Sequence, residues 1–234
     1  MKKWIIMLSL AAFSGLASCN NDAKLNGVIA VESEFETTAE GWQGGFAGYA
    51  SATPDTILDL TSERARLPAI LDSTRYGFKT EGNNSSDVMF MFVKKKITGL
   101  RPGTTYSVTF NMTIGTQYTD KTAGTSPGNN TFIKAGASAS EPIVTLLGSG
   151  IYTINLNKGN LAEGGNQMAA MGNISNGLDG NEYRLVTRSN GDNPVTVTAN
   201  TNGEVWLCVG TDSGYKGLAT LYYDRIRAEL TMQN

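Results

Sequence analysis

Several segments of the chain alternate between apolar and polar residues with the two-residue period of a β-strand. In YSVTFNMTI at 106–114, the apolar side chains share one face while serine, threonine and asparagine share the other. VMFMFV at 88–93 is continuously apolar, which predicts a strand buried on both faces. Further strands are expected at the following positions: 151–156, 183–186, 195–199, 204–210 and 218–230.

The spacing of these segments predicts how they pair. Segments 204–210 and 218–230 bracket the loop TDSGYKG, and this arrangement predicts a β-hairpin. Helical periodicity is weak, since only 62–67 and 166–174 could form a turn or two of helix. Many strands with little helix predict an all-β protein built as a two-sheet antiparallel sandwich.

One acid lies in phase with an apolar stripe. In LYYDRIRAEL at 221–230, the two-residue period places Asp224 on the same face as Tyr222 and Ile226. A buried carboxylate without a partner costs several kcal/mol. Asp224 is therefore expected to bind a cation, to pair with an arginine or to be exposed at a bulge. Arg225 and Arg227 point to the opposite face, so an arginine partner must come from elsewhere in the chain.

The N-terminus has the features of a lipoprotein signal. Two lysines precede an apolar run at 4–13, and the following Leu-Ala-Ser-Cys at 16–19 resembles a bacterial lipobox. The resemblance implies that residues 1–18 are a signal peptide and that Cys19 carries acyl chains such as palmitate, of which stable anchoring needs more than one. The alternative is an ordinary secretory cleavage site beside a chance cysteine. We therefore expect a lipidated tether at 19–28 and a single domain at 29–234, anchored in the bacterial cell envelope, with the outer membrane preferred to the inner.

Composition excludes several classes of function. Without residues 1–18, 17 Lys and Arg face 21 Asp and Glu, a net charge of −4 that disfavours nucleic acid as a partner. No glycine cluster leads into a helix in the manner of a phosphate-binding loop, which disfavours nucleotides. The chain has no histidine, so histidine-based triads and zinc sites are excluded. With Cys19 lipidated, Cys208 has no disulfide partner and is expected to be an inert core thiol.

The two ends of the chain together carry a resemblance. EFETTAEGW at 34–42 and LYYD at 221–224 resemble the galactose-binding-like jelly rolls, which include many carbohydrate-binding modules. The resemblance implies a jelly-roll-like sandwich in which Glu36 and Asp224 meet on adjoining strands, usually around a structural calcium. Calcium takes several oxygen ligands, which carboxylates and carbonyls supply. Nearly the whole mature chain also resembles an uncharacterised family of secreted bacterial proteins, which supports one domain and implies no function.

The candidate ligand-binding residues lie in predicted loops. Sugar sites combine an aromatic platform with polar groups. Trp42 and Tyr49 belong to the glycine-rich segment GWQGGFAGY, Tyr215 and Asp212 belong to the loop TDSGYKG, and Asp87 ends the polar run NNSSD. The alternatives are that Trp42 is a core residue and that NNSSD is a plain turn.

An acidic run raises the possibility of catalysis. In ESEFE, the residues Glu32, Glu34 and Glu36 share one face of an extended strand, a pattern that resembles the acid ladder of jelly-roll glucanases. The run departs from that ladder because Glu34 replaces a central aspartate and Ser33 occupies a spacer position, so a solvated strand start is preferred. The sequence favours a non-catalytic module that binds a carbohydrate or glycan. The alternatives are a structural or interaction lipoprotein whose partner is another envelope protein, and a glycoside hydrolase or lyase.

Overall fold

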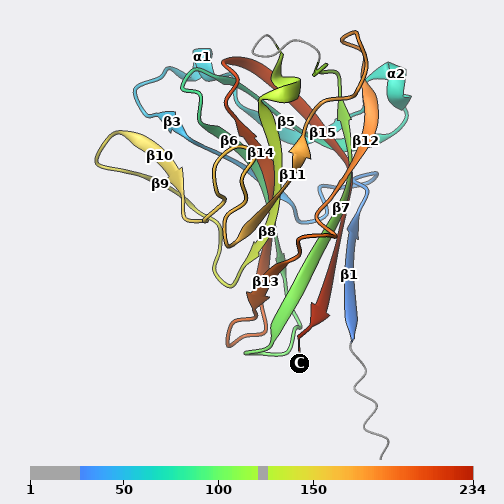
Figure 1. Ribbon diagram of the computed structural model, residues 1–234, viewed down its shortest axis with the longest axis vertical. Coiled ribbons are helices and arrows are strands. Elements are labelled where there is room, and N and C mark those ends of the chain that lie inside the picture. The colour runs from blue at the N-terminus through green and yellow to red at the C-terminus, as the bar shows by residue number, and fades with distance from the viewer. Residues whose placement is uncertain (1–26, 121–125, 234) are drawn as a thin grey trace, which may run out of the picture.

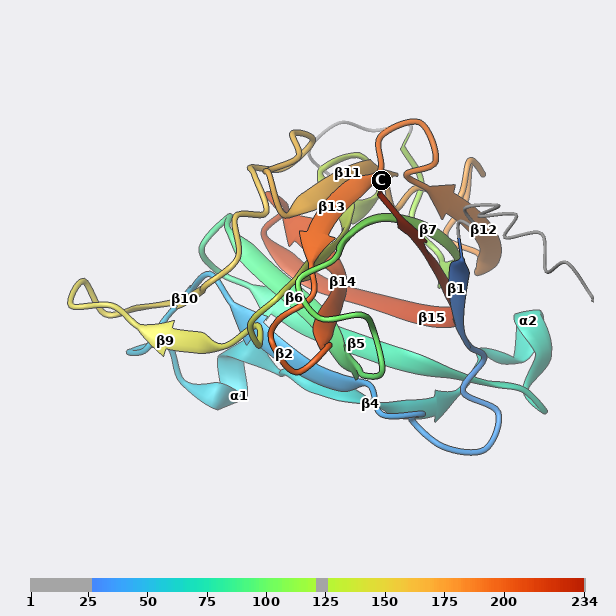
Figure 2. The same cartoon turned by 90° about the horizontal axis from the view of Figure 1, so that it is seen from below.

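Two antiparallel sheets face each other in a β-sandwich, with a smaller third sheet at one side (Figures 1 and 2). This computed structural model describes residues 27–120 and 126–233, so the predicted lipidation site Cys19 lies outside the described residues. The predicted all-β antiparallel sandwich is confirmed.

The strands of the described residues form three sheets, A, B and C. Sheet A has the order β12 (Arg184–Ser189), β7 (Thr105–Thr116), β15 (Gly217–Met232), β5 (Tyr76–Asn84) and β4 (Thr61–Arg66), with β1 (Val28–Ser33) on β15 and β13 (Val195–Thr198) on β7. Sheet B has the order β11 (Met168–Asn173), β8 (Thr131–Ser138), β14 (Val205–Ser213), β6 (Met89–Ile97) and β2 (Gln43–Ala47). Sheet C consists of β3 (Tyr49–Ala50), β10 (Ile151–Ile154) and β9 (Val144–Leu146).

Within residues 27–120 and 126–233, helix is confined to short turns. These are α1 (Asp55–Leu58), α2 (Ala69–Asp72) and a 3₁₀ turn at Pro127–Asn129. Among the described residues, no helix has the length and apolar character that crossing a bilayer requires.

The main core fills the space between sheets A and B. The predicted alternation in β7 is confirmed, since its inward side chains are at most 1% exposed: Tyr106, Val108, Phe110, Met112 and Ile114. A second core covers the other face of sheet B, where Phe90, Phe92 and Cys208 pack beneath sheet C. The strand predicted at 88–93 begins at Met89 and is buried on both faces through Val93, whereas Val88 is exposed. Burial raises the pKa of the Cys208 thiol.

The predicted hairpin between 204–210 and 218–230 is wrong. Both edges of β14 are occupied, by β6 and β8, and β15 pairs with strands of sheet A. The chain therefore crosses from sheet B to sheet A at Gly214–Lys216. The predicted helical turns are also wrong, because 62–67 lies largely in β4 and 166–174 contains β11. Segments this short cannot sustain a helix, and the edges of β5 and β8 offer ladder partners instead.

A β-bulge in β15 changes the phase of its side chains. Tyr223 pairs with Ile114 and Arg225 pairs with Thr113, so Asp224 is the extra residue. The core side chain before the bulge is Tyr223, fully buried, and not Tyr222 as the alternation predicted. After the bulge, Ile226, Ala228 and Leu230 face the core and the residues between them face outward.

Candidate functional site

Two strands meet end to end at the bulge. One edge of β15 pairs with β5 up to Tyr223 and with β1 from Ile226 onward, so Asp224 lies at the junction. Arg75, immediately before β5, bridges the two predicted acids: its guanidinium is 2.8 Å from Asp224 Oδ1 and 3.3 Å from Glu36 Oε1. Glu36 Oε2 also accepts a hydrogen bond from the Tyr76 amide at 3.2 Å. Both predicted acids therefore contact Arg75, although Glu36 lies beyond the end of β1 and not on a strand. Arg75 is the arginine from elsewhere in the chain that the sequence left open as a partner of Asp224.

The junction does not fit a calcium ion as it lies. Calcium prefers six to eight oxygen ligands, and the positive charge between these two carboxylates is already a guanidinium. No group of three or more acidic, histidine or cysteine side chains that could hold a metal occurs among the described residues. Burial raises the pKa of Asp224, and the nearby Arg75 opposes that rise. The Asp224 carboxylate therefore has Arg75 as its cation partner. The calcium ion that the resemblance implies at this junction is still only a prediction.

Two of the predicted ligand-binding residues are buried. Trp42 is 3% exposed, and its indole N–H donates to Ser33 Oγ at 3.0 Å. It is therefore a core residue, the alternative that the sequence left open. Asp212 is 1% exposed, and its Oδ2 accepts hydrogen bonds from Lys158 Nζ at 2.6 Å and from the Leu161 amide at 2.8 Å. Neither side chain offers a surface to a large ligand, so the expectation of an exposed platform at these positions is wrong.

The other three predicted ligand-binding residues lie in two places. Tyr49 is half-buried and packs against Tyr152 with ring centroids 4.9 Å apart. Asp87 forms an ion pair with Lys216 at 3.2 Å, and the adjacent Tyr215 lines a hollow of about 260 Å³. The structure thus brings Asp87 near the β14–β15 connection and places Tyr49 in sheet C.

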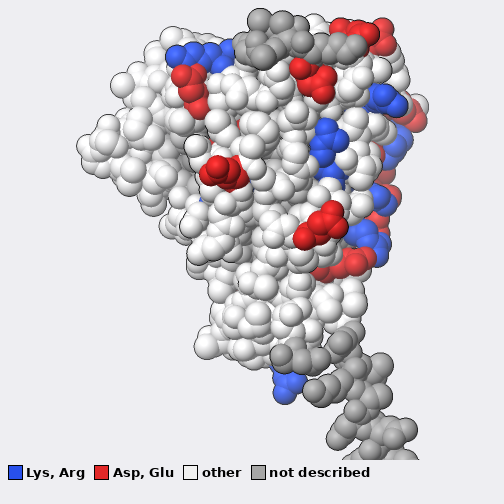
Figure 3. Space-filling view, in the orientation of Figure 1, with Lys and Arg blue, Asp and Glu red and all other residues white. Residues whose placement is uncertain are grey.

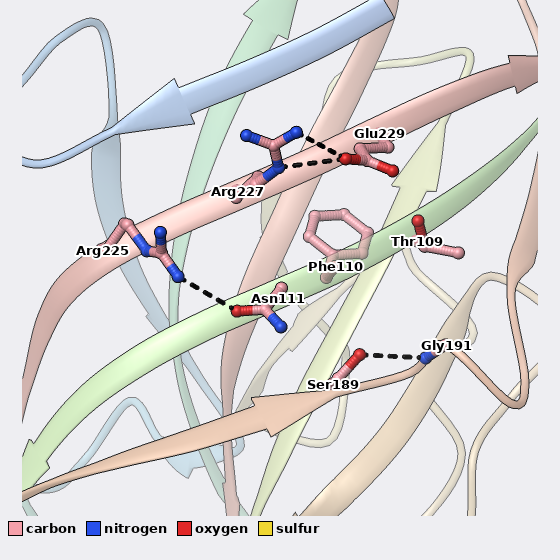
Figure 4. A pocket seen from close by; sticks show the side chains of 8 residues that line it. All are labelled: Thr109, Phe110, Asn111, Ser189, Gly191, Arg225, Arg227 and Glu229. Atoms are coloured by element: carbon pink, nitrogen blue, oxygen red, sulfur yellow. Dashed lines mark hydrogen bonds and ion pairs between the residues drawn. The ribbon is translucent and has the colours of Figure 1, made fainter. Parts of the chain in front are cut away.

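A hollow with a volume of about 420 Å³ lies on the outward face of sheet A (Figure 4). Its walls come from β7, β15 and the end of β12 with the loop that follows. Most of its polar side chains form hydrogen bonds. The residues that line it are Thr109, Phe110, Asn111, Ser189, Gly191, Arg225, Arg227 and Glu229, of which Phe110 is a core residue, 1% exposed. The bulge determines this lining, because it turns the apolar residues of β15 inward and leaves the charged ones outward.

The hollow lies where the edge of β7 changes partner. β12 pairs with Asn111–Thr116 and β13 with Thr105–Val108, so neither strand reaches Phe110. Asn190 fills the gap, since its Oδ1 accepts the Phe110 amide hydrogen bond at 2.5 Å. The backbone is satisfied at this break, and the polar side chains around it remain on the surface.

The two arginines of the hollow are held differently. Arg227 lies 2.6 Å from Glu229 Oε1 and 3.1 Å from Glu32 Oε2, and these carboxylates raise its pKa. Arg225 has longer contacts, 3.3 Å to Glu32 and 3.4 Å to the Asn111 side chain. A guanidinium has five N–H donors, so Arg225 retains donors for a ligand.

The acidic run does not form a ladder. β1 ends at Ser33, and Phe35 has a φ of 62°, so Glu34 and Glu36 lie beyond the strand. Glu32 pairs with the outward arginines of β15, whereas Glu36 pairs with Arg75 at the junction. The glutamates that could have formed a paired-acid site therefore lie in different places and contact different arginines.

Sequence reasoning missed the residues of the hollow. The polar face of 106–114 and the outward position of Arg225 and Arg227 were visible as separate patterns. Their proximity depends on β7 and β15 being neighbours in sheet A, which no local pattern encodes.

The comparisons with known proteins give remote matches only. No family model matches the chain, and no curated protein matches it in sequence. Among solved structures, it is similar to a carbohydrate-binding module that recognises mannan, at 12% identity and a TM-score of 0.38, covering 89% of this chain and 99% of that one. It is also similar to a module specific for non-crystalline cellulose, at 10% identity and a TM-score of 0.36, covering 84% and 89%.

A third match is the enzymatically active domain of tailspike protein 4 from bacteriophage CBA120, at 10% identity and a TM-score of 0.36. This match covers 83% of the present chain and 20% of the tailspike chain, so the protein spans about a fifth of that relative. At these identities and TM-scores, none of the matches decides what the present chain binds.

Proposed function

We propose that this protein is a non-catalytic binding module for a carbohydrate or glycan, and that the hollow on sheet A receives the ligand. The observation that carries the proposal is the lining of that hollow. Hydroxyl, amide, carboxylate and guanidinium groups from neighbouring strands converge on about 420 Å³, within the roughly 300–1,000 Å³ of typical ligand sites. A sugar ring, rich in hydroxyl groups, matches such a mixture of donors and acceptors.

The same lining favours binding over catalysis. Glycosidic cleavage generally needs two carboxyl groups facing each other across the bond. Glu229 is the carboxylate of this lining, and Arg227 holds it at 2.6 Å. A hydrolase or lyase is therefore the less favoured alternative.

The proposal includes membrane attachment. Cys19 would carry the lipid, and the tether of 19–28, with a reach of about 15–20 Å, would hold the sandwich near an envelope membrane. The bound glycan would then belong to the envelope or to material outside it. An interaction lipoprotein that binds another envelope protein is the alternative, and a glycan screen separates the two.

The test is a polysaccharide binding screen of the full chain by affinity electrophoresis, repeated with Asn111→Ala. We expect the variant to bind the glycan about tenfold more weakly or worse, because the Asn111 side-chain amide can no longer form a hydrogen bond with the ligand. Thr113→Ala is the matched control: Thr113 lies on the same strand and face, is similarly half-buried and lies outside the hollow. Failure of the wild-type chain to bind any glycan, or equal effects of the two variants, would refute the proposal.

A further inference from the structure

A third cavity lies on the opposite side of the sandwich, between sheet B and the hairpin of β9 and β10. It has a volume of about 240 Å³, below the size of most drug-like ligand sites, and its lining is mainly apolar. Phe90 and Ile154 belong to the core beneath it, while Val88 and Leu147 form an exposed rim, at 50% and 49%. The cavity therefore suits a small molecule with an apolar body.

The surroundings of the cavity are unusually poor in charge. No charged residue occurs between positions 142 and 157, which include the whole hairpin. Figure 3 shows this projecting side of the molecule without blue or red atoms, in contrast to the edge along which β1 and β12 lie. Ile143 and Leu146 add exposed apolar surface, at 46% and 52%.

Lys158 places a positive charge in the cavity wall. Its ammonium group lies 5.5 Å from the Phe90 ring centroid and donates to Asp212 Oδ2 at 2.6 Å. The contact with the Gly159 carbonyl, at 3.4 Å, is long. An ammonium has three hydrogens, so Lys158 keeps one for a ligand.

A second lysine interacts with Asp212. Lys134 on β8 is fully buried, donates to the Glu163 carbonyl and feels the charges of Asp212, Lys158 and Glu163. Burial lowers its pKa to about 8, so at neutral pH it remains mostly protonated. Asp212 is the buried carboxylate of this group, whereas the side chain of Glu163 is exposed to solvent.

We propose that this cavity binds a small apolar carboxylate, with its hydrocarbon body against the exposed rim of Val88 and Leu147 and its carboxylate beside the Lys158 ammonium. The apolar body of the ligand covers the exposed apolar rim, and its carboxylate accepts a hydrogen bond from the remaining hydrogen of the Lys158 ammonium. This inference is independent of the glycan site, because the two hollows share no lining residue.

The experiment is calorimetric titration of the full chain in lipid nanodiscs with 3-phenylpropionate, corrected with empty nanodiscs. The neutral 3-phenylpropionamide, of the same shape, serves as the comparison ligand. We expect the carboxylate to bind about tenfold more tightly or better, as a charge-assisted hydrogen bond allows. Lys158→Met, which retains an apolar side chain, should bring the two affinities together.

Two neighbouring leucines provide variants that leave the buried charges intact. Leu147 and Leu146 are similarly exposed, but only Leu147 lines the cavity. Leu147→Ser should weaken 3-phenylpropionate binding several-fold, and Leu146→Ser should leave it unchanged. The inference is overturned if the acid does not bind at millimolar concentration, if the amide binds equally well, or if the two serine variants behave alike.

Discussion

Arg75 connects carboxylates from opposite ends of the chain, Glu36 near the start and Asp224 near the end. Asp224 is only 4% exposed, so it cannot recover full hydration if the guanidinium is removed. We expect Arg75→Met to lower the free energy of unfolding by about 1–3 kcal/mol, because the buried Asp224 carboxylate then lacks its ion-pair partner. Urea denaturation measures this loss, and adding Asp224→Asn to the variant should recover part of it.

Arg75 also bears on whether calcium binds between Glu36 and Asp224. Because Arg75 supplies the positive charge at the junction, thermal melts of the wild-type chain with excess calcium and with chelator should coincide. Arg75→Met is the informative variant, since it frees both carboxylates for a cation. A calcium-dependent rise in the melting temperature of the wild-type chain would contradict this account and restore the predicted calcium clamp.

Lys134 gives a pH dependence with a definite sign. The unfolded chain protonates this lysine up to its ordinary value near 10.5, whereas the folded chain, with its pKa near 8, releases the proton earlier. Between those values the unfolded state binds more protons, so the contribution of Lys134 to the free energy of unfolding rises with pH. Denaturation from pH 7.5 to 10 should show wild type gaining stability relative to Lys134→Met. A flat difference between wild type and Lys134→Met over this range would contradict the prediction.

At the level of elements, close strand packing depends on particular glycines. A Cβ added at Gly136 on β8 would lie 1.9 Å from the Gln167 carbonyl oxygen and 2.7 Å from Met168 Cα. Backbone cannot move aside cheaply, so Gly136→Ala should cost about 1–3 kcal/mol or more by overpacking. Gly148→Ala, where a Cβ meets no atom within 4 Å, should change stability by less than about 0.5 kcal/mol. Urea denaturation compares the two, and equal effects would show that β11 does not pack on β8 as described.

The strands predicted correctly are those whose own residues specify a face. In β7 the alternation is uninterrupted, and each inward residue is buried. In β15 the alternation looks continuous in the sequence, yet one inserted residue shifts the phase and moves Tyr222 outward. A bulge leaves no local mark in composition, and here it coincides with the point at which one edge of β15 changes partner from β5 to β1.

Strand pairing was less predictable than strand position. The connection between β14 and β15 is short, as in a hairpin, but β14 lies between β6 and β8 and has no free edge. The choice between pairing and crossing to the opposite sheet depends on segments far away in the sequence, such as Thr131–Ser138. Local spacing therefore located the turn and could not assign its partners.

At the level of the whole molecule, the place of the candidate site could not be predicted from the sequence. The loop aromatics suggested sugar binding, but Trp42 is a core residue and the polar hollow lies on strands β7, β12 and β15. Glycine-rich sequence around Trp42 is typical of an exposed loop, whereas here β2 pairs with β6 and its glycines accommodate Ser62 and the Phe92 ring. Convergence of side chains from separate strands is a property of the assembled sheet.

The proposed lipid anchor also has consequences for the whole molecule. β1 begins at Val28, paired with Thr231, so the chain enters the sandwich at the same end at which β15 finishes (Figure 1). Attachment through Cys19 would therefore place that end toward the membrane and the β14–β15 connection, with Asp87 and Tyr215, away from it. The hollow on sheet A would remain open to the side.

The cysteines allow a matched test of this attachment. Cys19→Ala should shift the protein from the membrane fraction to the soluble fraction and abolish labelling with a palmitate analogue, because the acyl acceptor is lost. Cys208→Ala removes the buried core thiol instead, so it should reduce stability and leave labelling and membrane attachment unchanged. Detergent phase partitioning with metabolic labelling measures both outcomes. Labelling of Cys19→Ala, or release of wild-type protein by high salt alone, would show that the chain is held at the membrane by something other than a lipid on Cys19.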